Sequence, residues 1–150
     1  MDSYNKDITL RRAELADKKQ VFTWRNHETI RKFATNPAII SWKTHSAWFD
    51  DILLSKDSFL LIGEINHKPL GVIRFDVKNE HAEVSVYLVP EFQGKGLGSS
   101  LIYKGNEWLK LQRPLIKKVN ATILSENETS ISAFDKAGFK IISYEMEHKL

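Results

Sequence analysis

The 150-residue chain contains no cysteine, which excludes disulfide bridges, thiolate metal ligands and a cysteine nucleophile. Its seven glycines and four prolines do not gather in a linker or a low-complexity tract, and no internal repeat is present. No apolar run approaches the length of a membrane span, and the first residues lack the basic-then-apolar layout of a signal peptide. We therefore expect a single domain over residues 1–150 in a soluble cytoplasmic protein that does not bind membranes.

The composition is that of a chain with a folded core, and its charge is not typical of a nucleic-acid-binding protein. Apolar residues make up 42% of the chain, and the formal charge of +3 comes from 22 basic and 19 acidic residues spread along it. Basic residues cluster modestly in the first third, which suits a phosphate-bearing small molecule, although a solvated basic face explains the cluster equally well. The five histidines lack the spacing of a metal site. We expect neither nucleic acid nor a metal as a ligand.

Hydrophobic periodicity predicts the elements of the first half of the chain. Ile8 to Arg12 has the pattern of a strand, and Glu14 to about Phe33 has a helical pattern that breaks near Asn26-His27, with Leu15 and Phe33 among the residues available for burial. Ser41 is the expected N-cap of a second helix. Two helices therefore follow the first strand.

From Phe59 onward the apolar period changes to that of strands. Two apolar runs flank a turn-like Asn66-His67-Lys68-Pro69, which predicts an antiparallel hairpin. The resulting order β-α-α-β-β-β-α-β-α-β predicts an α/β fold, in which about four helices flank a central mixed sheet. The expected elements are strands Phe59–Ile65, Leu70–Val77 and Glu83–Val89, a helix from Lys95 to Gln112, a strand Val119–Leu124, a helix Asn127–Ala137 and a last strand Phe139–Glu147.

The sharpest local signal is the sequence Gln-Gly-Lys-Gly-Leu-Gly at residues 93–98, between a strand and a helix. A loop that opens a helix presents unpaired N–H groups and the positive end of the helix dipole, and its glycines let a diphosphate approach the backbone. The glycine spacing fits neither a Walker loop nor a dinucleotide fingerprint. The loop is therefore predicted to bind an anion, unless it is only a glycine-rich turn.

This loop resembles the pyrophosphate loop of the GNAT N-acetyltransferases, which reads Q/R-x-x-G-x-G/A between the fourth strand and the third helix. Gln93, Gly96 and Gly98 match that pattern, and Asn127 to Phe139 resembles the family's second signature. The resemblance implies the GNAT fold and acetyl-CoA as co-substrate, with no metal. The residues that it implies for cofactor binding are Leu88, Val89, Gln93, Gly94, Lys95, Gly96, Leu97, Gly98, Ser99, Asn127 and Phe134.

Acetyl transfer to an amine needs a neutral amine, a stabilised oxyanion and a proton for the departing thiolate unless it leaves as such. Glu83 is the candidate base, because related enzymes often carry a glutamate at this strand position. The alternative is that Glu83 is only an exposed glutamate on a strand. The family's usual tyrosine acid is replaced here by Phe134, so Tyr87, water or direct loss of the thiolate must substitute. A backbone N–H near Leu88 or Val89 would bind the thioester carbonyl. The predicted catalytic residues are Glu83 and Tyr87.

The first third of the chain carries the expected acceptor side. Its Trp-Arg-Asn sequence, followed by an arginine and by His-x-x-Trp-Phe, resembles the N-acetyltransferases of the pseudaminic acid pathway, which acetylate the 4-amine of a UDP-linked deoxyamino sugar. Arginines suit a diphosphate, and aromatic rings suit a uracil or sugar. The same aromatic and histidine side chains also suit a helix core. The implied substrate-binding residues are Trp24, Arg25, Asn26, Arg31 and His45.

Other acceptors and one non-enzymatic role stay open. Acetyltransferases for protein N-termini, ribosomal proteins or polyamines share the layout and part of the Trp-Arg motif. A polyamine pocket is expected to be acidic, whereas this part of the chain is basic. A CoA-binding regulator that has lost its acid is the alternative outside catalysis, and a homodimer also stays open. The principal hypothesis is direct, acetyl-CoA-dependent acetylation of a small-molecule amine, with a nucleotide sugar as acceptor.

Overall fold

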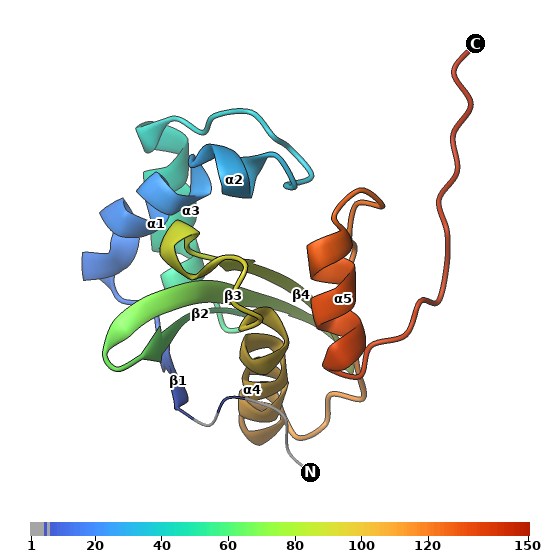
Figure 1. Cartoon of the computed structure of the whole chain (residues 1–150). Helices are drawn as coiled ribbons and strands as arrows, with labels where there is room; N and C mark the ends of the chain where they lie inside the picture. The colour runs from blue at the N-terminus through green and yellow to red at the C-terminus, as the bar shows by residue number, and fades with distance from the viewer. Residues whose placement is uncertain (1–4, 6) are drawn as a thin grey trace.

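The computed structural model describes residue 5 and residues 7–150, and a mixed sheet runs through its centre (Figure 1). The sheet has five strands in the order β1-β2-β3-β4-β5. Neighbouring strands are antiparallel except β4 and β5, which are parallel, so the predicted mixed sheet is confirmed. The strands are β1 (Ile8–Arg12), β2 (Ser58–Ile65), β3 (Lys68–Lys78), β4 (His81–Leu88) and β5 (Lys118–Asn120).

Helices cover both faces of this sheet. Figure 1 shows α1, α2 and α3 on one face and α4 across the other, with α5 beside α4. The α-helices are α1 (Lys18–Arg25), α2 (Glu28–Arg31), α3 (Trp42–Leu54), α4 (Gly98–Gln112) and α5 (Glu128–Lys136). Two short 3-10 helices are η1 (Leu15–Asp17) and η2 (Pro90–Phe92). We call the surface of the sheet under α1 and α3 the acceptor face and the surface under α4 the α4 face.

Local signals explain where the first helices begin and end. The expected break occurs at Asn26-His27, and His27 caps α2 by accepting the Thr29 N–H. Ser41 Oγ accepts the Thr44 N–H at 3.2 Å, which confirms the predicted N-cap of α3. Leu15, expected to be buried, is 64% exposed because it lies in η1, outside the helix whose apolar stripe meets the sheet.

Each face of the sheet has its own apolar core. On the α4 face, Phe75 and Ile73 are fully buried with Leu101 and Ile102 of α4. On the acceptor face, the largest fully buried side chain is Phe49 of α3, which packs in a cluster with residues of β2 and β3. The alternation of side chains along β4 divides that strand between the two cores.

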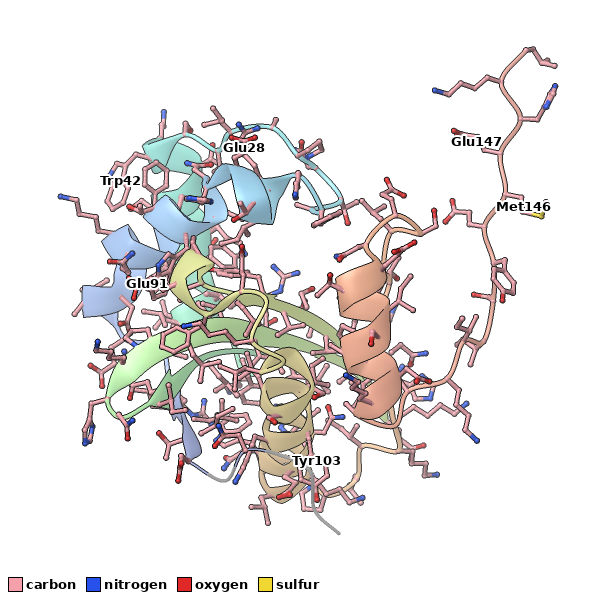
Figure 2. The ribbon with its side chains drawn as sticks, in the orientation of Figure 1. Glu28, Trp42, Glu91, Tyr103, Met146 and Glu147 are labelled. Carbon is pink, nitrogen blue, oxygen red and sulfur yellow. The ribbon has the colours of Figure 1, made fainter. Side chains whose placement is uncertain are left out.

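Two predictions near the end of the chain are wrong. β5 ends at Asn120 rather than at Leu124, because the chain diverges from β4 there. The expected last strand, Phe139–Glu147, does not form. Residues 140–150 are exposed and run away from the helices, as Met146 and Glu147 show in Figure 2. An alternating apolar pattern yields a strand only where a neighbouring strand accepts its hydrogen bonds, and this segment has no such neighbour among the described residues.

Candidate functional site

β4 has one open edge. Its parallel ladder with β5 stops at the pair Glu83 and Asn120, so on that side the rest of β4 has no strand beside it among the described residues. The Val89 N–H donates to Leu70 O, which fixes the alternation of hydrogen-bonding residues between β3 and β4. By that alternation, the backbone groups of Val86 and Leu88 point to the open edge. An extended ligand could pair there as a strand would.

Of the two residues predicted to offer backbone groups to the cofactor, Leu88 has an N–H that points to the open edge, whereas the N–H of Val89 is already bonded. The Val89 N–H is used by Leu70 O at 2.9 Å, and Val89 O accepts the Phe92 N–H at 2.9 Å. The Val89 N–H is therefore taken up by β3 and is not free for an oxyanion, and a cofactor contact at Val89 stays a prediction. Val86 was missed in the sequence, although its period-2 relation to Leu88 was the signal that could have found it.

The Gly-rich loop follows η2 and leads directly into α4. Gly94 and Gly96 have φ angles of 75° and 72°, a backbone region that glycine adopts without strain. Added Cβ atoms at these two positions would have no neighbour within 4 Å, so the loop is open to a ligand. The glycines thus keep the loop both turned and accessible.

The start of α4 leaves its backbone donors unsatisfied. Leu97 is the N-cap and its side chain makes no capping hydrogen bond. None of the N–H groups of residues 94–100 donates to another backbone group within the described part of the chain. The Lys95 ammonium lies 5.4 Å from the centre of the Phe92 ring, at the same loop. Free amides, a helix N-terminus and a lysine fit the pyrophosphate of CoA.

Gln93 connects this loop to the acceptor side of the molecule. Its Nε2 group donates to Leu88 O at 3.2 Å and to Thr29 Oγ1 of α2 at 3.1 Å. The predicted role of Gln93 in cofactor binding therefore has a structural component: its amide holds β4, the loop and α2 together.

α5 completes the surroundings of the loop. A Cβ at Gly98 would lie 3.2 Å from the Ala133 Cβ, so glycine allows α4 and α5 to approach closely. Asn127 caps α5 by accepting the Ser130 N–H at 3.2 Å. Phe134 is buried, and its ring packs edge-on against Phe139, so it lies in the core beneath the site.

The predicted catalytic residues share the acceptor face. Glu83, Ser85 and Tyr87 alternate along β4 with the apolar residues of the α4 face. Glu83 is exposed and stands directly opposite Asp76 of β3, whose carboxylate pairs with Arg74 at 3.0 Å. Glu83 therefore has open access to a ligand on this face.

Tyr87 lies deeper than Glu83. Its hydroxyl is buried and has no hydrogen-bond partner among the described residues. Burial raises the pKa of the phenol well above its usual range, and the neighbouring charge of Arg25 only partly opposes this effect. The hydroxyl is therefore protonated at neutral pH.

The five predicted acceptor-binding residues do not all reach this face as ligands. Asn26 uses its amide on the backbone of Ile40, with contacts of 2.8 and 2.9 Å, and so closes the loop between α2 and α3. Trp24 packs in the core of the acceptor face. Arg25 and Arg31 donate to backbone carbonyl groups and form no ion pair with a carboxylate of the described residues.

His45 is a core residue rather than an acceptor ligand, which corrects the sequence-based assignment. It is 1% exposed and is surrounded by aromatic rings of α1 and α3. Its Nε2 lies 2.8 Å from Lys18 O, and since a carbonyl only accepts, Nε2 carries the proton. Burial lowers the pKa of His45.

Neither a metal centre nor a membrane span is found among residues 5 and 7–150. No group of three or more acidic or histidine side chains there could hold a metal ion. No helix in that part of the chain is long and apolar enough to cross a membrane.

Two curated proteins of Methanocaldococcus jannaschii are similar in sequence. One, described as an uncharacterized N-acetyltransferase, is 29% identical over 107 residues, which cover 65% of this chain and 46% of that protein. The other is an uncharacterized protein, 28% identical over 89% of this chain and 28% of its own length. The chain thus spans less than half of either relative.

Solved structures share the fold at lower sequence identity. The spermidine N-acetyltransferase of Vibrio cholerae, in complex with CoA and spermine, superposes with a TM-score of 0.85 and 19% identity over 97% of this chain and 88% of its own. AAC(6')-Ib, an aminoglycoside acetyltransferase, in complex with ribostamycin and CoA, gives a TM-score of 0.80 and 20% identity over 90% and 84%.

The family follows from the sequence itself as well as from the fold. The family model for the acetyltransferase (GNAT) domain matches residues 7–140, which include the sheet, the Gly-rich loop and α5. The GNAT fold expected from the sequence is therefore confirmed, and the chain belongs to the GNAT acetyltransferase family.

Proposed function

We propose that this chain transfers the acetyl group of acetyl-CoA directly to a primary amine of a small molecule. The observation that carries the proposal is the uncapped, Gly-rich start of α4 beside the open edge of β4. Acetyl-CoA supplies an acetyl thioester and is released as a thiol. The amides of residues 94–100 would hold its pyrophosphate, and the backbone of Val86 and Leu88 would pair with its extended arm.

The acceptor face would supply the proton transfers. Glu83 would take the proton of the attacking amine, directly or through water. Tyr87 lies on the same face, and its hydroxyl would donate a hydrogen bond to the departing sulfur, which leaves as a thiolate and takes its proton from water. The Leu88 N–H points to the open edge and would donate to the developing oxyanion. No acyl-enzyme is needed, and the chain has no cysteine to form one.

The class of small-molecule amine is a finer question. The solved structures with this fold are in complex with spermine and with ribostamycin, which supports the polyamine-type alternative over a nucleotide sugar. The observation that still favours an anionic acceptor such as a nucleotide sugar is the pair of arginines on the acceptor face. Both classes share the same donor site and the same direct attack.

Thiol release from acetyl-CoA tests the proposal. We expect release that depends on an added primary amine, together with a protein mass that stays unchanged after incubation with acetyl-CoA alone. Stoichiometric acetylation of the protein would contradict direct transfer. Tight CoA binding without turnover on polyamine, aminoglycoside, peptide and amino-sugar acceptors would favour a CoA-binding regulator instead.

A further inference from the structure

Arg25 is half-buried and has no anionic partner among the described residues. Its Nη2 donates to Asn36 O at 2.8 Å, whereas its Nη1 is buried and has no hydrogen-bond partner among the described residues. Leaving an ionised nitrogen buried and unpaired is costly in free energy. An anionic ligand that accepted a hydrogen bond from Nη1 would remove this cost.

The surroundings of Arg25 are positive. Burial is the main cause that lowers its pKa, and the charges of Arg31 and Arg74 lower it further, whereas only the Tyr87 hydroxyl acts in the opposite direction. Arg74 already has an anion, because its Nε lies 3.0 Å from Asp76. Arg31 has none in the described chain, since its guanidinium donates to the carbonyl groups of Asn26 and Pro37.

We propose that Arg25 and Arg31 bind an oxyanion carried by the acceptor, so that the substrate class is a small primary amine bearing a phosphate or a carboxylate. This inference rests on the proposed function and deepens it. The buried Tyr87 hydroxyl borders the same site and is also unpartnered, so it can donate to an oxygen of the same ligand or to the reacting group. The polar atoms left open here are donors, which is what an oxyanion requires.

The position of Arg25 in the fold indicates that the anion belongs to the acceptor rather than to CoA. Arg25 interacts electrostatically with Tyr87 and Arg74, both on the acceptor face. The helix α4, which the loop of residues 93–98 opens, packs on the other face, and Gln93 at the start of the loop reaches α2. The reacting amine must meet the thioester at the open edge of β4, whose acceptor-face side chains include Tyr87. An anion on Arg25 would therefore be part of the same small molecule as the amine.

This site is unsuited to a polycation. Spermine in the Vibrio cholerae relative carries only positive charge, and Arg25 and Arg31 would repel it. The carboxylate of Asp76 is already neutralised by Arg74. We therefore expect the acceptor preference of this chain to differ from that of its structural relative even though the fold is shared.

Two matched pairs of acceptors test the inference. Glucosamine is compared with glucosamine 6-phosphate, and β-alaninamide with β-alanine, by initial rates of thiol release at saturating acetyl-CoA. We expect kcat/KM to be roughly tenfold or more higher for the anionic member of at least one pair. The first pair reports a phosphate site and the second a carboxylate site. Equal or lower kcat/KM for both anionic members would overturn the inference. If the members that lack the anionic group, or spermidine, are turned over, the proposed function is left standing.

Arg25→Gln tests whether the preference for an anionic acceptor depends on Arg25. Lys43→Gln is the control, because it removes one positive charge from the exposed side of α3. We expect Arg25→Gln to raise KM for the preferred anionic acceptor and to remove most of the preference, whereas Lys43→Gln keeps it. Raised KM for acetyl-CoA with an unchanged acceptor preference would assign Arg25 to the cofactor and overturn the inference.

Glucose 6-phosphate, which lacks the amine, separates this inference from the proposed function. With CoA bound, we expect it to bind the wild-type protein and the Lys43→Gln variant more tightly than it binds Arg25→Gln, as measured by calorimetry. Arg25-dependent binding without turnover of any amine would keep the anion site and reject the acetyl transfer. If the preferred member is β-alanine, propionate takes the place of glucose 6-phosphate, and Arg25-independent binding of the matching anion overturns the inference.

Discussion

Gln93 and Thr29 are 64 residues apart in sequence, yet the Gln93 amide donates to the Thr29 hydroxyl at 3.1 Å. The same amide also donates to Leu88 O, at the open edge of β4. One side chain therefore links the cofactor loop, the strand that borders the reaction site and the helix next to the acceptor arginines. Disturbing this link should alter the binding of cofactor and acceptor together.

Thr29→Val removes the hydroxyl acceptor at nearly constant volume and should loosen the loop. We expect KM for acetyl-CoA to rise about threefold to tenfold, which corresponds to the ~1 kcal/mol of one hydrogen bond. The measurement is a set of initial rates with acetyl-CoA varied at fixed acceptor. Thr23→Val is the control, since Thr23 is exposed on α1 and its hydroxyl contacts only Lys19 O. Equal KM values for both variants would mean that the link does not support the loop.

Gly96→Trp should abolish CoA binding while the protein stays folded. The side chain would fill the open space above the loop, and its Cβ would be strained at a φ of 72°. Calorimetric titration with CoA and thermal unfolding measure the two effects separately. Gly138→Ala is the matched control, because Gly138 also has a positive φ, 97°, but ends α5 away from the loop. Unchanged CoA affinity in Gly96→Trp would remove the loop from the binding site.

The sequence predicts the loop well because its determinants are local. Two glycines with positive φ and the start of a helix lie within six residues, and no distant contact is needed to set them. The mixed sheet was predictable for a similar reason, since each strand carries its own apolar period. The order of the elements came from the same periodicity and agrees with the family resemblance.

The errors in the site all depend on distant pairing. The sequence does not show which of Leu88 and Val89 turns its N–H toward β3, and only the register with Leu70 shows that the Val89 N–H is already bonded. His45 and Asn26 are polar residues near a presumed pocket, but the backbone groups of Lys18 and Ile40 take them up once α1, α2 and α3 pack. The partners that decide these roles are far away in sequence.

Glu83→Gln should lower turnover by removing the proposed base from the acceptor face. General-base catalysis contributes about 10²- to 10⁴-fold, so a drop of kcat/KM within that range is expected. The rise of the rate with pH should also become shallower, because the variant has no carboxylate to accept the proton of the amine. Glu107→Gln on the exposed side of α4 is the control. A pH–rate profile identical to that of the wild type would reject Glu83 as the base.

His45→Gln should change how stability depends on pH. The pKa of His45 is lowered in the folded protein by burial, so below its ordinary value of about 6.5 the unfolded chain takes up the proton first. The free energy of unfolding therefore falls as the pH drops through that value, and the contribution is fully present above it. In His45→Gln this part of the acid destabilisation should vanish.

Urea unfolding at pH 8 and pH 5 measures this effect for the wild type, for His45→Gln and for His81→Gln, whose histidine is exposed on β4. At pH 8, His45→Gln should cost about 1 kcal/mol or more, since the donor to Lys18 O and the ring contacts with Phe22 and Trp48 are changed. Between the two pH values, it should lose less stability than the wild type does, whereas His81→Gln should behave like the wild type. An equal loss in all three proteins would mean that His45 does not couple folding to protonation.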